Sequence, residues 1–286
     1  MEIIERRGFK IRVNNNADKY LLLTNDNLST AKGFMLDNGL RKAELNYVFG
    51  FTQESTDFFK DYSFVDDVAI IPAPNIDITG INHLKNLKRL RISHPHKQEL
   101  DFMNFPLLEY ASFDWNNKVK NLDKAINLKS LSIFKWKMED FSFLSPLTNL
   151  EELKIVSSAI KDLGGLNTLV KLRTLELYIN TKLTSLSGID TVCATLTTLI
   201  IETCKQLNKI DEVSALQNLE NLEVNNCGNI DSLKPITGLK KLKRIRFVES
   251  TNILDGDISP CIGRKLVAFQ NRKNYTHTNE QIDRIR

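Results

Sequence analysis

Histidine and cysteine are the residues of this chain best suited to metal binding or nucleophilic chemistry, and it has four of each. The histidines are His83, His94, His96 and His277. Only His94 and His96 lie close in sequence, and no cysteine or carboxylate stands beside them at a ligand spacing. Because a metal ion needs several converging ligands, we interpret this pair as part of a surface turn and expect no metal site.

The four cysteines are Cys193, Cys204, Cys227 and Cys261, and none belongs to a Cys-x-x-Cys pair. A zinc site or a redox dithiol is therefore not expected. Cys204 and Cys227 are separated by one period of the repeat that runs through the chain, so we expect them to be stacked, buried and inert. Unpaired cysteines favour a reducing compartment, and we expect a cytoplasmic protein. The Asn, Lys and Ile content is typical of bacterial proteins.

Catalytic motifs are missing from the sequence. Gly164-Gly165 is not followed by Lys-Ser or Lys-Thr, so it does not form a phosphate-binding loop, and no Gly-x-Ser-x-Gly occurs. We therefore expect no catalytic residues, no cofactor and no enzymatic activity. The alternative is an enzyme whose site lies in residues 1–62, although so short a segment is small for an enzyme.

The net charge is +4, from 39 basic and 35 acidic residues. Such a weak excess does not indicate a nucleic-acid-binding protein, which usually gathers basic residues on one face. The charged start of the chain, Met1 to Arg7, is not followed by an apolar run, so we expect no secretory signal. No apolar stretch approaches the roughly 18 residues of a membrane span.

The dominant feature is a repeat of the form apolar-x-x-apolar-x-apolar. It begins at Val65, Leu87, Leu108, Leu128, Leu150, Leu172, Leu196, Leu219 and Leu242. The second half of each unit has apolar residues at helical spacing, as in Ile230, Leu233 and Ile236. The change from a period of roughly 2 to one of roughly 3.6 predicts a strand, a turn and a helical segment in each unit. One such unit cannot bury its own apolar face, so stacked units must share a continuous core.

These repeats resemble the leucine-rich-repeat family, in the short class of internalins and of a regulatory subunit of protein phosphatase 1. The resemblance implies a right-handed α/β solenoid with a parallel concave sheet, short helices or 3-10 turns on the convex side, and a cap at each end. The polar family position eight residues after the first leucine, which bonds backbone groups in the turn, holds Asn116, Ser158, Asn180, Cys204, Cys227 and Ser250. Pro95 and Trp136 depart from that pattern.

We divide the chain into three parts. Residues 1–63 are an N-terminal cap with a degenerate first repeat at Leu40 to Leu45, residues 64–262 are the repeats, and residues 263–286 are a C-terminal cap. Within the last part, Leu266 to Phe269 fits a strand. Thr278-Asn279-Glu280-Gln281 has the form of a capping box that starts a short helix.

The residues between the inner apolar positions of each strand must face outward on the concave sheet, because strand side chains alternate. Bulky aromatic residues and a loose band of carboxylates occupy these positions, with arginines flanking the band. The predicted partner-binding residues are Tyr110, Trp115, Phe134, Glu152, Glu176, Tyr178, Glu202, Glu223, Arg89 and Arg91. Aromatic and arginine side chains are frequent anchors of protein interfaces.

The pattern favours a non-catalytic module that binds another protein on its concave face and is monomeric when free. A more specific hypothesis is an inhibitor or immunity protein that neutralises a basic toxin, such as a nuclease. One alternative is a scaffold or regulatory subunit of an enzyme. Another is a single-stranded nucleic-acid binder that uses the arginines and aromatic residues, but the interposed glutamates disfavour it.

Overall fold

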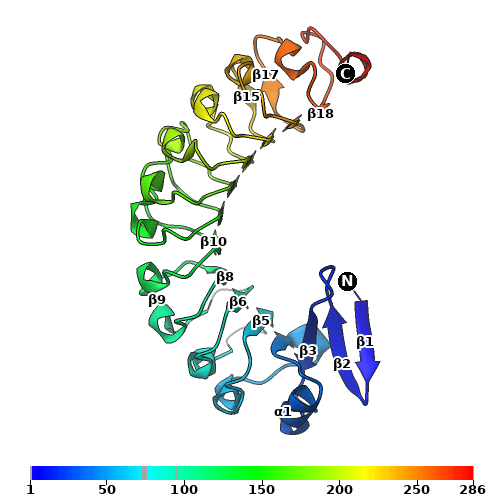
Figure 1. The fold of residues 1–286 in the computed structure, drawn as a ribbon, viewed down its shortest axis with the longest axis vertical. Helices are drawn as coiled ribbons and strands as arrows, with labels where there is room; N and C mark the ends of the chain where they lie inside the picture. Colours follow the sequence, from blue (N-terminus) through cyan, green and yellow to red (C-terminus); the bar gives the residue numbers. More distant parts are fainter. Residues whose placement is uncertain (1, 72–75, 94–95, 286) are drawn as a thin grey trace. The chain divides into compact units, whose positions relative to one another are not determined.

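The computed structural model describes residues 2–71, 76–93 and 96–285, and the chain forms two compact units, Met1–Leu128 and Lys129–Arg286. Each unit is a row of short strands joined through 3-10 helices on the opposite side (Figure 1). His94 and Pro95 lie outside the described residues, so the predicted turn there is not tested. Within each of these units, successive repeats pack their leucines against one another. The predicted parallel solenoid is therefore confirmed.

The first unit combines an N-terminal hairpin with the first repeats. Its sheet contains β1 (Glu2–Arg6), β2 (Phe9–Val13), β3 (Lys19–Leu23), β4 (Lys42–Asn46), β5 (Asp67–Ile71), β6 (Arg89–Ile92) and β8 (Tyr110–Asp114), in that order. The first two pairings, β1 with β2 and β2 with β3, are antiparallel. All later pairings in this unit are parallel, beginning with β3 and β4.

The other elements of the first unit lie between its sheet strands. They are α1 (Leu28–Asp37), η1 (Tyr47–Phe49), η2 (Asp57–Asp61), η3 (Thr79–His83), η4 (Phe102–Asn104), η5 (Leu122–Lys124), and the paired strands β7 (Leu100–Asp101) and β9 (Val119–Lys120). The predicted imperfect first repeat at Leu40 to Leu45 corresponds to β4, which pairs in register with β5.

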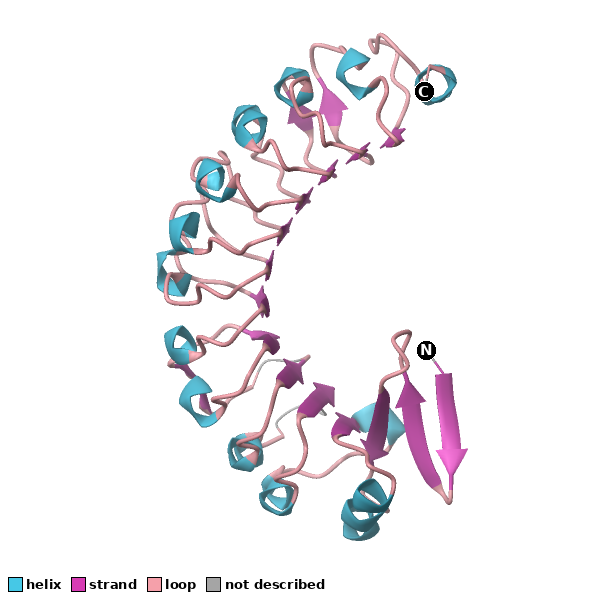
Figure 2. Cartoon of the chain, viewed as in Figure 1, coloured by secondary structure: helices cyan, strands magenta, loops and turns pink. Residues whose placement is uncertain are grey.

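The second unit is the more regular one. Its sheet contains β10 (Ser130–Phe134), β11 (Glu152–Val156), β12 (Thr174–Tyr178), β13 (Thr198–Glu202), β14 (Asn221–Asn225), β16 (Arg244–Phe247) and β18 (Leu266–Phe269), all paired in parallel. Within this unit the strands line the inner side of an arc and the 3-10 helices its outer side (Figure 2).

The remaining elements of the second unit are its 3-10 helices, a small two-stranded sheet and a terminal α-helix. They are η6 (Ser142–Leu144), η7 (Leu166–Thr168), η8 (Ile189–Val192), η9 (Asp211–Ala215), η10 (Lys234–Ile236), η11 (Ser259–Cys261), β15 (Asn229–Ile230), β17 (Asn252–Ile253) and α2 (Asn279–Arg284). Thr278 and Gln281 form the predicted capping box at the start of α2, and β18 is the predicted last strand.

The core is the stack of inner apolar positions of successive repeats. Leu175 pairs in register with Leu199, and the latter with Leu222, and all three are fully buried. Glycine permits the close stacking of the turns behind them. A Cβ on Gly165, which has a φ of +88°, would lie 2.2 Å from the backbone nitrogen of Ser142. Alternating apolar residues and turn glycines therefore fix the spacing of the repeats.

A left-handed residue follows each long strand of the second unit up to β16. These residues are Lys135, Ser157, Ile179, Thr203, Asn226 and Glu249, with φ between 52° and 61°. The amides of the first four bond the last residue of the next strand, as Ile179 N does to Glu202 O at 2.8 Å. The turn is therefore a repeated device that directs the chain away from the sheet.

The polar family position works as the resemblance implies in the middle repeats. Asn180 Oδ1 accepts from the backbone N–H of Ser158 at 3.1 Å and from its hydroxyl. In the last repeat the expectation of Ser250 is wrong. Ser250 is exposed, and Thr251, which is buried, accepts from the Cys227 N–H at 3.0 Å.

The turn that carries Trp136 is closed differently, as its departure from the pattern predicts. The Trp136 indole is buried and its Nε1 donates to the carbonyl of Asp140 at 3.3 Å. A large ring thus fills the volume that a small polar side chain leaves in other repeats.

Candidate functional site

The sheet face holds the predicted partner-binding residues in two groups, one in each unit. The first unit contains Arg89, Arg91, Tyr110 and Trp115. The second contains Phe134, Glu152, Glu176, Tyr178, Glu202 and Glu223. Except for Trp115, all of these residues lie on long sheet strands at the alternating positions that face away from the core.

A buried carboxylate, that of Asp67, lies beside two arginines on the neighbouring strand of the first unit. Asp67 begins β5, is 1% exposed, and has Arg89 as its register partner on β6. Its oxygens lie 3.5 Å from Arg89 Nε and 3.4 Å from an amino nitrogen of Arg91. One carboxylate therefore serves two guanidinium groups, which we call the arginine pair.

Two tyrosine rings support the arginine pair. Arg89 Cζ lies 4.2 Å from the ring centroid of Tyr110, and Arg91 Cζ lies 4.9 Å from that of Tyr20. The Tyr20 hydroxyl donates to Asp67. Burial and the hydrogen bond with Asp67 raise the pKa of Tyr20 to about 12, and burial raises the pKa of the Asp67 carboxyl. The phenol is thus protonated at neutral pH and orients the carboxylate between the two arginines.

Charged side chains surround Tyr178, the last residue of β12, in the second unit. Lys154 Nζ lies 4.3 Å from its ring centroid and 3.3 Å from the Glu176 carboxylate. Burial and three nearby carboxylates raise the pKa of Tyr178 to about 12. Those carboxylates belong to Glu176, Glu202 and Glu223. The half-buried tyrosine ring therefore lies in an acidic surrounding that attracts cations.

The predicted band of carboxylates is interrupted by basic side chains. Glu176 pairs with Lys154, and Glu223 lies 3.7 Å from a guanidinium nitrogen of Arg246. Glu202, the register partner of Tyr178, has no ion pair with any residue that the structure describes. Instead of the predicted loose band of carboxylates, the face presents Glu202 without an ion pair among the described residues, beside the Tyr178 ring.

The expectation that Trp115 is exposed is wrong. Its side chain is 8% exposed, because Trp115 follows the last residue of β8 and strand alternation no longer decides its direction. Tyr110 and Phe134 are half-buried. Glu152 is exposed, as predicted, and accepts a hydrogen bond of 2.8 Å from the Ser130 hydroxyl.

Three residues that shape the site were not among the predicted binding residues: Tyr20, Asp67 and Lys154. Lys154 and Glu176 occupy equivalent positions in adjacent repeats, as do Glu223 and Arg246. Aligning repeats by charge would therefore have revealed both ion pairs. Tyr20 lies on β3, before the repeats begin, so no periodic signal indicates that it contacts Arg91.

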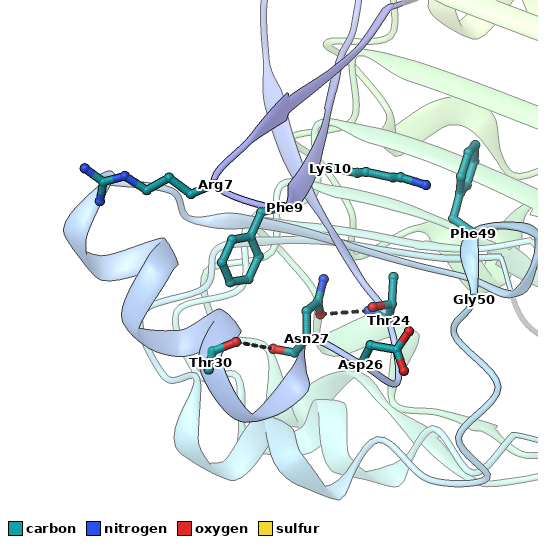
Figure 3. A pocket seen from close by; sticks show the side chains of 10 residues that line it. Arg7, Phe9, Lys10, Thr24, Asp26, Asn27, Thr30, Phe49 and Gly50 are labelled. Atoms are coloured by element: carbon teal, nitrogen blue, oxygen red, sulfur yellow. Dashed lines mark hydrogen bonds between the residues drawn. The ribbon is translucent and has the colours of Figure 1, made fainter.

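The first unit also contains a cavity of about 380 Å³ beside the N-terminus of α1 (Figure 3). Arg7, Lys10 and Asp26 give its lining charges of both signs. Asn27 Oδ1 accepts from the Thr24 N–H at 2.9 Å, so this amide holds the turn that precedes the helix. We assign the cavity no chemistry.

Among the described residues, no group of three or more His, Cys, Asp or Glu side chains could hold a metal ion. His96 is buried, its Nδ1–H donates to the Gln98 carbonyl at 2.8 Å, and burial lowers its pKa. None of the described helices is long and apolar enough to cross a membrane.

The stacked cysteines are buried free thiols, as predicted. Cys204 and Cys227 are both fully buried, and Cys227 Sγ lies 3.1 Å from the Asn225 carbonyl. The hydrogen bond with Cys204, together with burial, raises the pKa of the Cys227 thiol. Such a thiol is a poor nucleophile, so its place is in the turn rather than in chemistry.

Comparisons with known proteins agree with this geometry. No protein-family model matches the chain, and no curated protein sequence matches it. An internalin of Listeria monocytogenes is similar in structure, with a TM-score of 0.52 and 19% identity over 89% of this chain and 87% of the internalin. A leucine-rich-repeat protein of Leptospira interrogans has a TM-score of 0.42 and 14% identity over 88% of this chain and 82% of its own.

Proposed function

We propose that this chain, which has the leucine-rich-repeat fold, is a non-catalytic module that binds another protein on its sheet face. The observation that carries the proposal is the arrangement around Tyr178. A half-buried aromatic ring lies next to Glu202, a carboxylate without an ion pair among the described residues. Tyrosine is one of the residues enriched among the energetic anchors of protein interfaces.

The chemistry of this surface favours a basic partner. Lys154 already lies over the Tyr178 ring and against Glu176, which indicates the kind of group that the site accepts. Lys154 contacts the Tyr178 ring and the Glu176 carboxylate. An arginine or lysine of a partner could contact the same ring and the Glu202 carboxylate in an equivalent way. We infer that the partner is a basic protein, with an inhibitor or immunity role toward a toxin as the specific form.

The same geometry supports binding over catalysis. The thiols of Cys204 and Cys227 lie against backbone carbonyls in their turns, and the N-terminal segment is part of the sheet through β3 and β4. One alternative, a scaffold or regulatory subunit of an enzyme, would use the same surface with a different partner. The other alternative, a single-stranded nucleic-acid binder, is disfavoured by the glutamates of this surface. We further propose that the protein acts in the cytoplasm, where its free cysteines would remain reduced.

The experiment is capture of a partner from the native cell, followed by affinity measurements on the captured protein at low and high salt. Tyr178→Ala should weaken binding by about 2 kcal/mol, since anchor side chains carry that much. Glu202→Lys should mainly slow association, and the difference should shrink in high salt.

Asp190→Lys is the matched control, because Asp190 is an exposed carboxylate on η8, on the side opposite the sheet. It should bind like the wild type. If Tyr178→Ala, Glu202→Lys and Asp190→Lys all bind the partner as tightly as the wild type does, the interface lies elsewhere. If the captured protein is acidic, the assignment of a basic partner is wrong. Inhibition of an enzymatic or toxic activity of the partner would distinguish an inhibitor from a scaffold.

A further inference from the structure

The arginine pair of the first unit has hydrogen-bond donors that no described residue satisfies. Arg89 faces Asp67 through Nε at 3.5 Å, and this carboxylate is its only polar partner among residues 2–71, 76–93 and 96–285. The two terminal amino groups of Arg89 therefore make no hydrogen bond to a described residue, and the side chain is 44% exposed and open to a ligand. The Asp67 contacts are also long for a direct hydrogen bond, which is usually 2.7–3.2 Å. The pair thus retains capacity for a second acceptor.

The pair is held in place before any partner arrives. Arg89 is stacked on Tyr110 at 4.2 Å and Arg91 on Tyr20 at 4.9 Å, and Tyr20 is itself bonded to the buried Asp67. A stacked guanidinium has already lost much of its side-chain freedom, so less is lost when a ligand binds. This distinguishes the pair from the exposed lysines and arginines elsewhere on the chain.

The neighbours of Arg91 leave room for a small acceptor. Its register partners are Ala69 on β5 and Ser112 on β8, and both side chains are small. The Ser112 hydroxyl has no hydrogen bond to a described residue, so it is a further donor at the strand position that pairs with Arg91.

The cluster around the arginine pair has an excess of one positive charge. Two guanidinium groups share the single carboxylate of Asp67, while the tyrosines are neutral and Lys42 is paired with Asp18. We propose that the arginine pair is a receptor for one carboxylate of an acidic segment of a partner protein, bound by the Arg89 amino groups and the Ser112 hydroxyl. A carboxylate restores balance, whereas a phosphate dianion would add excess negative charge beside buried Asp67.

This proposal adds a partner group of opposite sign to the one expected in the second unit, and it stands independently of that function. The test uses a short oligoglutamate peptide as the probe, with an oligolysine of equal length and oligothymidylate as comparisons. Calorimetric titration of the wild type should detect the oligoglutamate. Arg89→Gln should weaken that binding at least tenfold, because it removes charge-assisted hydrogen bonds to the bound carboxylate.

Arg89→Lys tests the role of the planar guanidinium, because it keeps the positive charge and removes the stacked planar group. Arg89→Lys should therefore bind oligoglutamate almost as weakly as Arg89→Gln does. Arg244→Gln, an exposed arginine on the sheet face of the second unit, is the matched control and should bind like the wild type. Tyr178→Ala should also leave oligoglutamate binding unchanged, which separates this proposal from the proposed function. Circular dichroism confirms that each variant is folded.

Three results would overturn the proposal. One is a wild type that does not bind oligoglutamate, and another is an Arg244→Gln variant that loses as much affinity as Arg89→Gln. The third is Arg89-dependent binding of oligothymidylate that is tighter than that of oligoglutamate, which would instead assign the pair to nucleic acid.

Discussion

The hydroxyl of Tyr20 and the carboxylate of Asp67 connect the N-terminal strands to the first repeats. Tyr20 lies on β3 and Asp67 on β5, and the hydrogen bond between them crosses the intervening strand. Both residues are almost fully buried, and the carboxylate of Asp67 supplies the acceptor that the buried Tyr20 hydroxyl needs.

This pair predicts a loss of stability at alkaline pH. The pKa of Tyr20 is raised from 10.0 to about 12, so the folded state holds the phenolic proton more tightly than the unfolded chain. The resulting stabilisation is complete below pH 10 and is lost as the pH rises through about 12. Tyr20→Phe should therefore flatten the fall of the unfolding free energy between these pH values, as measured by urea denaturation.

Tyr47→Phe is the control for the Tyr20 substitution, because Tyr47 is an exposed tyrosine of the same unit. Tyrosinate absorbance should also show one fewer late-titrating group in Tyr20→Phe, while Tyr47→Phe should retain it. An unchanged alkaline slope in Tyr20→Phe would mean that the phenol titrates freely.

Strand alternation predicted which side chains face outward, but it did not predict which of these side chains contact one another. Arg89, Arg91 and Tyr110 were correctly assigned to the outer positions of their strands. The contact of Arg91 with Tyr20 could not be predicted, because it joins a segment without a repeat to one with a repeat. Trp115 was misassigned for a related reason, since the rule of alternation ends where the strand ends.

At the scale of the element, the turn after each strand requires a left-handed residue, yet several such positions hold poorly suited side chains. Ile179 has a φ of 57°, although branched residues strongly disfavour this region, and it is 44% exposed. Asn226 occupies the equivalent position after β14 and fits it well.

Ile179→Asn should accordingly increase the free energy of unfolding by about 1 kcal/mol, because asparagine tolerates this conformation. Urea denaturation would measure the gain. The reverse change, Asn226→Ile, should lower stability by at least as much, since Asn226 also bonds Lys205 and Ser250. A loss of stability in Ile179→Asn would show that the apolar contacts of Ile179 outweigh its strain.

The leucine positions were the most predictable part of each repeat. Leu175 and Leu222 were expected to be buried, and both are fully buried. Leu175→Ala should lower the free energy of unfolding by about 2–5 kcal/mol, since it leaves a cavity in a packed stack. Val170→Ala, at an exposed turn position, should change it by less than about 0.5 kcal/mol. Equal effects of the two substitutions would show that the leucine stack is not the core.

At the scale of the whole chain, each repeat is stabilised mainly by its neighbours, so the last repeat depends on its cap. Arg264 supplies part of that cap by donating to the carbonyls of Ile236, Leu239 and Leu242. These bonds give a polar partner to backbone carbonyls in the segment that leads into β16.

Arg264→Met should destabilise the C-terminal repeats locally, by about 2 kcal/mol for the lost charged hydrogen bonds. Hydrogen exchange should quicken for amides in residues 236–269 and remain unchanged in residues 150–180. Lys265→Met is the control, because Lys265 is exposed and should not alter exchange. Uniform quickening across the second unit would indicate that its repeats open together rather than from the end.

The ends of the chain show the limits of prediction from sequence at this scale. The capping box at Thr278 has a recognisable spacing, and α2 starts there as expected. The first strand, β1, was not anticipated, because charges flank its two isoleucines and the hairpin turn begins with Arg7 at a φ of 52°, where glycine or asparagine is the usual signal. Repeats reveal themselves by period, whereas a cap occurs once and leaves only local signals.

The two tryptophans of the chain fall one in each unit, Trp115 in the first and Trp136 in the second. Both indoles are buried, so unfolding of either unit would expose its own chromophore to water and shift its emission to the red. Trp136→Phe and Trp115→Phe would therefore turn the protein into two optical reporters. Each would record the melting of one unit, and the two traces would reveal whether the chain melts as one cooperative body or as two.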